Sequence, residues 1–124
     1  MYASKLSQTP LNESLELIMK DYEEKSIDAS YAQSLIQSIT ENYAEIICVI
    51  DPAISIRSKA NTTDVEMSIL TLATAELVYQ PDTPAKVVIN EAIELAKKYG
   101  ADEGYKFVNG VLDKVHKSID GTAS

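Results

Sequence analysis

The residues best suited to catalysis or metal binding are few, because the 124-residue chain contains one histidine and one cysteine. His116 lies beside Val115 near the end of the chain, and Cys48 lies between Ile47 and Val49 in an apolar run. A structural zinc site takes four cysteine or histidine ligands, which this content does not supply. A Cys–His nucleophile would require Cys48 and His116 to meet, and we expect Cys48 to be a small core residue instead. We therefore predict no catalytic site, no metal site and no cofactor, and a protein that is not an enzyme.

Binding chemistry is better represented, on the outer side of the last predicted helix. Lys106, Asn109 and Asp113 recur at three- and four-residue spacing, which places them on one helical face. Phe107 lies beside them and is expected to begin the buried stripe of the same helix. Such a mixed face binds a phosphate backbone or a protein surface, or is simply solvated, and composition does not distinguish these alternatives.

Two glutamates belong to an otherwise apolar helix. Glu76 is in line with Ile69 and Leu72, and an unpaired buried carboxylate is costly. We expect it to bond Lys86 or a neighbouring helix N-terminus, or else to face a partner. Glu66 follows the start of this helix by one turn, where an acid complements the helix dipole.

The elements that carry these residues are predicted to be helices, and the stretch 82–114 is the clearest pair. Thr83 is expected to cap a helix whose first residue is Pro84. Gly100 is expected to end that helix in the left-handed conformation. A second helix follows, with an apolar stripe that runs from Phe107 to Ile119, and the short connection predicts an antiparallel pair.

Three further helices are predicted before this pair. One runs from an N-cap at Asn12 to about residue 24, and one spans about 28–50 before Asp51-Pro52 ends it. The third, capped by Thr62 or Thr63, spans 64–80 and is apolar on almost every side, so we expect it to be the central helix. A short helical piece is expected within 54–59.

No segment alternates with the period of a strand, so the fold class is all-α, a compact bundle of about five to seven helices. We predict an N-terminal helical subdomain over 1–60, a C-terminal one over 61–120, and a tail at 121–124.

Charge and composition limit the partners. The net charge is −8, and the only arginine is Arg57. Phosphate contacts need Lys and Arg, so strong autonomous binding of nucleic acid is not expected. No apolar run is long enough to span a membrane, and a lone cysteine favours a reducing compartment. We therefore expect a cytoplasmic protein.

A long sequence pattern resembles a known family. It consists of D-x-P-x-K-V-x-I-N-E-A-x-E-L-A-K-x-Y-G over 82–100, then F-V-N-G-V-L-D-K over 107–114, preceded by V-E-x-x-I-L over 65–70 and A-E-L over 75–77. This pattern is similar to the C-terminal signature of the NusB family of transcription antitermination factors. The resemblance covers about 64–117, whereas residues 1–58 match only in helix placement and apolar pattern.

The resemblance implies a helical, non-enzymatic protein that pairs with a small ribosomal-subunit protein acting as NusE. The pair would bind boxA, a single-stranded RNA element, within the RNA polymerase antitermination complex that reads through terminators, notably in ribosomal RNA operons. By this resemblance Glu66 belongs to the partner-protein surface, and Tyr2 matches a tyrosine near the end of the family's first helix. The RNA-binding candidates lie on the exposed side of one segment: Glu103, Lys106, Phe107 and Asn109.

The sequence also departs from the family pattern. NusB proteins usually begin with an arginine-rich first helix that contacts RNA, and no Arg-Arg-x-x-Arg motif occurs here. We therefore expect a truncated first helix, weak RNA binding by the chain alone, and an exposed groove suited to a partner or to homodimerisation. Two alternatives remain open: an RNA-recognition module of the ribosomal RNA methyltransferase type, and a helical interaction domain that has lost RNA binding.

Overall fold

The computed structural model describes residues 10–25, 29–54, 62–80, 82–100 and 103–120. These residues form five α-helices and one short 3-10 helix, and no strand occurs among them. The predicted all-α fold of five to seven helices is confirmed. The elements are α2 (Pro10–Lys25), α3 (Ala29–Ile50), η1 (Asp51–Ala53), α5 (Asp64–Tyr79), α6 (Ala85–Tyr99) and α7 (Gly104–Asp120).

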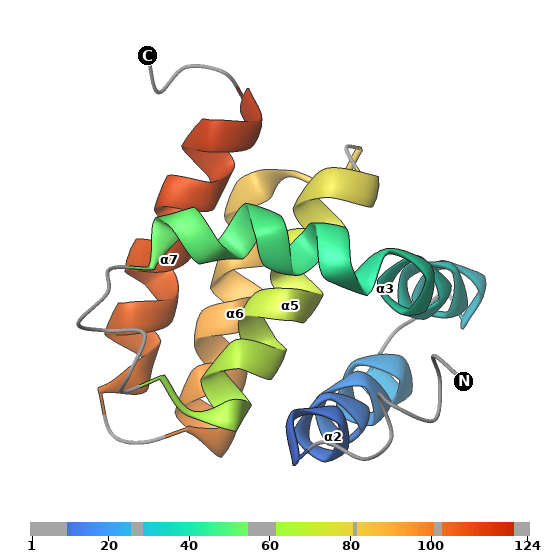
Figure 1. The fold of residues 1–124 in the computed structure, drawn as a ribbon. Coiled ribbons are helices and arrows are strands. Elements are labelled where there is room, and N and C mark those ends of the chain that lie inside the picture. Colours follow the sequence, from blue (N-terminus) through green and yellow to red (C-terminus); the bar gives the residue numbers. More distant parts are fainter. Residues whose placement is uncertain (1–9, 26–28, 55–61, 81, 101–102, 121–124) are drawn as a thin grey trace.

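Helix α5 is the centre of the fold. It packs against α2, α3, α6 and α7, and Figure 1 shows α3 crossing over it toward α7 while α6 and α7 lie side by side. Ile69, Leu70 and Ala75 are fully buried although they point in different directions around the helix. The sequence is apolar on nearly all sides because neighbours cover nearly all sides, as predicted.

The start of α5 is fixed by a capping box. The Thr63 hydroxyl accepts a hydrogen bond from the Glu66 backbone N–H at 3.1 Å, and Glu66 Oε1 accepts one from the Thr63 backbone N–H at 3.0 Å. Each side chain thereby satisfies a backbone donor that the helix itself leaves free. Of the two residues predicted as the cap, Thr62 or Thr63, the structure shows Thr63.

Helix α3 is long and bends at Asn42, where the backbone angles are φ −125° and ψ 25°. The helix ends at Ile50, directly before Asp51-Pro52, as predicted. Ile46 and Ile50 are buried one turn apart, which places position 48 roughly 200° around the helix from Ile46. Cys48 is accordingly exposed, and the prediction that it is a core residue is wrong.

The start of α6 differs from the prediction. The helix begins at Ala85, and the carbonyl of Pro84 accepts the first hydrogen bonds, from the backbone N–H groups of Val87 and Val88. Thr83 makes no capping bond, because its hydroxyl lies 2.8 Å from the hydroxyl of Tyr31 on α3. Thr83 therefore joins α3 to the start of α6 instead of closing the helix end.

The predicted ends of α6 and α7 also need correction. Gly100 is extended, with φ −97°, so no left-handed residue ends α6. A Cβ at this position would lie 2.7 Å from the Ala96 carbonyl oxygen, so glycine permits a close backbone approach. In α7, Val115 is buried but Ile119 is 41% exposed, because the last turn of the helix passes beyond the core.

The N-terminal part begins earlier than predicted. Helix α2 starts at Pro10, so Asn12 lies inside the helix and not at its cap.

Most of the expected helical piece at 54–59 and the tail at 121–124 fall outside the described residues. Helix α5 packs against helices both before and after residue 60, and the division into subdomains there stays a prediction. None of the described helices has the length and apolarity needed to cross a bilayer.

Candidate functional site

The first turn of α7 carries the predicted RNA-facing residues. Glu103 immediately precedes the helix, and its carbonyl accepts a hydrogen bond from the Lys106 backbone N–H at 3.1 Å. Glu103, Lys106 and Asn109 are exposed, whereas Phe107 is half-buried and packs against the hydrophobic core. Three of the four candidates are thus available to a ligand on one helix end, and the fourth anchors that end to the fold.

The ammonium of Lys106 is only weakly held. Its Nζ lies 3.6 Å from Glu103 Oε2, and the two side chains are 61% and 77% exposed. An exposed pair of this kind contributes roughly 0–1 kcal/mol, so a phosphate group can compete for the lysine. Glu103 therefore limits the positive charge that this turn presents.

Two aromatic residues near this turn were not predicted from the sequence. Lys97 Nζ lies 5.0 Å from the ring centroid of Tyr105, and Lys98 Nζ lies 5.1 Å from that of Tyr99. Both tyrosines are half-buried. Single-stranded RNA is commonly bound by aromatic rings flanked by cations. In the sequence, the two tyrosines flank the connection that runs from Gly100 to Glu103. This proximity to the predicted RNA-binding segment is the signal from which they could have been found.

Glu66 lies against the same end of α7. It is 7% exposed, and a Cβ at Gly104 would lie 2.6 Å from its Oε2. The structure thus brings the candidate partner-binding acid beside the first residue of the candidate RNA-binding helix. The Glu66 carboxylate is also occupied by the capping box, so its contribution to any interface is combined with its role in the fold. Tyr2 lies outside the described residues.

Glu76 is bound by two tyrosines, neither of which was expected. Its Oε2 accepts hydrogen bonds from the hydroxyls of Tyr22 on α2 at 3.0 Å and Tyr31 on α3 at 2.9 Å. The carboxyl is 4% exposed, and burial together with the nearby charge of Glu91 outweighs the tyrosine bonds and raises its pKa. Burial and the charge of Glu76 likewise raise the pKa of Tyr22. The expected partner Lys86 is exposed on α6.

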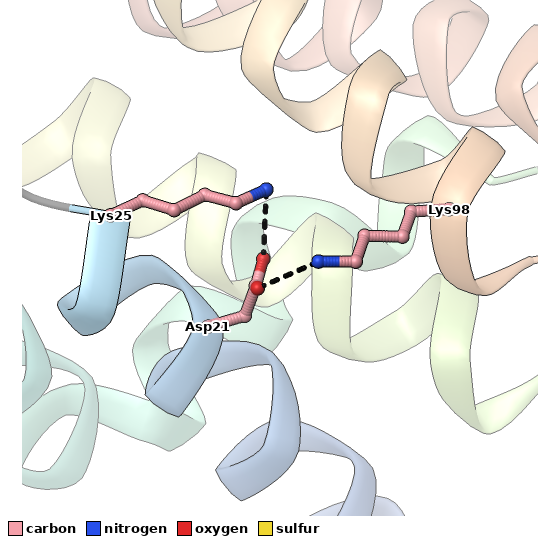
Figure 2. Close-up of polar contacts among 3 residues, drawn as sticks. All are labelled: Asp21, Lys25 and Lys98. Carbon is pink, nitrogen blue, oxygen red and sulfur yellow. Dashed lines mark hydrogen bonds and ion pairs between the residues drawn. The ribbon is translucent and has the colours of Figure 1, made fainter.

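A second polar contact joins α2 to α6. Figure 2 shows Asp21 between two lysines: Lys98 Nζ donates to Oδ1 at 2.9 Å, and Lys25 Nζ lies 3.4 Å from Oδ2. Burial disfavours the charged carboxylate, but the hydrogen bonds from Lys98 and Lys25 outweigh it and hold the pKa of Asp21 below its ordinary value. This contact fixes the end of α2 against the signature helix α6.

Within the described ranges, no three His, Cys, Asp or Glu residues are grouped so that they would hold a metal ion. The polar groups described above are arranged for binding and for fixing helices. A model of the NusB family matches residues 1–117.

The chain belongs to the NusB family.

Several curated NusB proteins resemble it along most of its length. The transcription antitermination protein NusB of Pseudoalteromonas atlantica is 42% identical over 119 residues, which is 96% of this chain and 84% of that protein. NusB of Mannheimia succiniciproducens is 40% identical over 120 residues, covering 96% and 82%. NusB of Colwellia psychrerythraea is 40% identical over 119 residues, covering 96% and 86%. The predicted family, and with it the interpretation as a transcription antitermination factor, is confirmed.

The NusB signature corresponds to α6, the connection after it, and α7. The family match extends to residue 1, well beyond the stretch 64–117 in which the sequence pattern was clear. This extension includes α2 and α3, which supply core residues and whose polar contacts onto α5 and α6 involve Tyr22, Tyr31 and Asp21.

Proposed function

We propose that this NusB-family chain is a non-enzymatic antitermination adaptor that works in the cytoplasm. It pairs with a small ribosomal-subunit protein in the NusE role, and the pair binds boxA-type single-stranded RNA for the RNA polymerase antitermination complex. The observation that carries the proposal is the contact between Glu66 and Gly104. It supports a continuous surface in which the partner-binding end of α5 adjoins the RNA-binding end of α7.

The charge of the chain supports a shared RNA site. With 11 basic and 19 acidic residues, the chain repels phosphate on average. The basic and aromatic side chains near the start of α7 can attract RNA locally, but they provide few phosphate contacts. Affinity for single-stranded RNA depends on the number of such contacts, so the partner must supply additional ones.

The coverage of the NusB relatives favours this function over the methyltransferase-module alternative. The chain aligns with more than four fifths of the length of the NusB proteins of Pseudoalteromonas atlantica and Mannheimia succiniciproducens, both named as transcription antitermination proteins.

Lys106→Ala is expected to weaken binding of boxA RNA by the chain and its ribosomal partner roughly fivefold at moderate salt, because one phosphate contact is lost. The slope of log affinity against log salt should fall by about 0.7, the value for one single-strand contact.

Glu103→Gln should strengthen binding, since it removes the carboxylate that lies 3.6 Å from the lysine ammonium. Fluorescence anisotropy of labelled RNA measures the affinities of both variants and the salt dependence of binding.

Lys114→Ala is the matched control, because Lys114 is an exposed lysine on the same helix two turns further on. It changes the net charge by the same amount. If Lys106→Ala and Lys114→Ala weaken RNA binding equally, the first turn of α7 is not the RNA site and only bulk charge matters.

A further inference from the structure

A cavity of about 430 Å³ lies between α2, α3 and α6, at the opposite end of α5 from the Glu66 capping box. Glu76 of α5, with Tyr22 and Tyr31 bonded to it, lines the buried side of the cavity. Glu91 and Glu94 of α6 line it as well and are exposed. A volume of this size is in the range of sites that hold small ligands or single side chains.

The cavity is strongly acidic. Four carboxylates and one lysine are among its lining residues. Asp21 is already paired with Lys25 and Lys98, but Glu76 receives its hydrogen bonds from tyrosine hydroxyls. Glu91 and Glu94 form no ion pair with any residue in the described part of the chain. Three carboxylates therefore share the cavity without a neutralising cation from the described residues.

The acidic groups are accompanied by apolar and aromatic surface. Val87 is 44% exposed although it is a large apolar residue, and it lines the cavity with Leu95. Tyr22 of α2 and Tyr31 of α3 contribute aromatic rings to the lining. A cation with an apolar stem and a flat, delocalised head contacts such a wall, stacks on tyrosine and bonds carboxylates in pairs. Arginine has these properties, whereas a compact ammonium or a hydrated metal ion has only the charge.

We propose that this cavity is a docking site for an arginine side chain presented by a basic segment of a protein partner. The guanidinium lies between Glu76 and the carboxylates of α6, and its methylene stem lies on Val87. Charge complementarity selects this occupant, because the same carboxylates repel RNA phosphates. The site is separate from the RNA-binding turn of α7, so it does not depend on the antitermination role proposed above.

The probe is a blocked pentapeptide, acetyl-Gly-Gly-Arg-Gly-Gly-amide, titrated into the full chain and followed by amide chemical shifts. Saturable shifts are expected around Tyr22, Val87 and Glu91, with a Kd on the order of 1 mM. A peptide with citrulline in place of arginine has nearly the same shape without the charge and should bind at least roughly tenfold more weakly.

The variant Glu91→Gln/Glu94→Gln removes two exposed carboxylates from the cavity and is expected to weaken the arginine peptide roughly tenfold. Glu41→Gln/Glu45→Gln on the exposed side of α3 makes the same charge change elsewhere and should leave binding unchanged. Equal weakening by the two double variants would overturn the proposal, as would equal binding of the citrulline peptide. Shifts of the same residues with hexauridylate, or on concentrating the chain alone, would assign the cavity to RNA or to a second copy and also overturn it.

Discussion

Glu66→Lys is expected to lower the free energy of unfolding by about 3 kcal/mol, a large fraction of the stability of a domain of this size. The substitution removes the hydrogen bond that the Thr63 backbone N–H donates to the Glu66 carboxylate, which alone costs about 1 kcal/mol. It also places an ammonium at a helix N-terminus, where the dipole disfavours a cation, in a position that is 7% exposed. The close approach of Gly104 leaves the longer side chain no room on that side.

Urea unfolding of Glu66→Lys beside Glu66→Gln separates the fold from the interface. Glutamine keeps an oxygen that accepts from the Thr63 N–H, so it should retain stability to within about 0.5 kcal/mol. If the folded Glu66→Gln variant binds the ribosomal partner more weakly, the charge of Glu66 belongs to the interface. An unchanged unfolding midpoint for Glu66→Lys would mean that the capping box does not stabilise α5.

Glu76→Ala is expected to cost about 2 kcal/mol, because the hydroxyls of Tyr22 and Tyr31 lose their shared acceptor and a void forms beside α5. These bonds hold α2 and α3 onto the central helix. Glu76→Gln, whose amide oxygen still accepts from both tyrosines, should keep the fold close to the original stability. Thermal unfolding at neutral pH compares the two variants.

The pH dependence of Glu76→Gln gives a second test with a defined sign. Burial raises the pKa of Glu76 in the folded state, so the native chain holds its proton more tightly than the unfolded chain. Stability from this group is complete below the unfolded pKa, near 4.5, and is lost as the pH rises through the higher folded pKa. The stability of Glu76→Gln relative to the original chain should therefore increase as the pH rises from about 4.5. A difference that stays constant from acid to neutral pH would contradict a raised pKa.

The helices of this fold follow from local signals in the sequence. The start of α5 was predicted from Thr62 or Thr63 as the cap, and Glu66 was expected only to complement the helix dipole, although its spacing from Thr63 is that of a capping box. The stripe of α3 predicted the burial of Leu35, Ile39 and Ile46 because their positions depend only on helical periodicity. At these positions, where neighbours in sequence determine the structure, the prediction was correct.

Contacts between helices that are distant in the sequence could not be predicted from local patterns. Tyr22 and Tyr31 are 54 and 45 positions from Glu76, and nothing local indicates that two hydroxyls would replace the expected lysine as its partners. Thr83 was predicted as a cap from its position before Pro84. Its hydroxyl instead forms a hydrogen bond with the hydroxyl of Tyr31, which lies on another helix. The same reason applies to the contact of Glu66 with Gly104, which depends on how α5 and α7 pack.

The exposed residues of the candidate RNA site came from the family resemblance and not from periodicity. Helical spacing placed Lys106 and Asn109 on an outer face, but a solvated face would have the same pattern. The half-buried Tyr105 was missed because a single tyrosine between polar residues has no period, and its pairing with Lys97 crosses from α6 to α7.

The central claim is that this chain binds boxA RNA as one half of a pair. Its most direct test is an anisotropy titration of labelled boxA RNA with the chain alone, with the small ribosomal-subunit partner alone, and with both together at ~150 mM salt. The adaptor function predicts that the pair binds at least roughly tenfold more tightly than either protein alone, as expected for coupled binding. An affinity of the chain for RNA that is the same with and without the partner would contradict it.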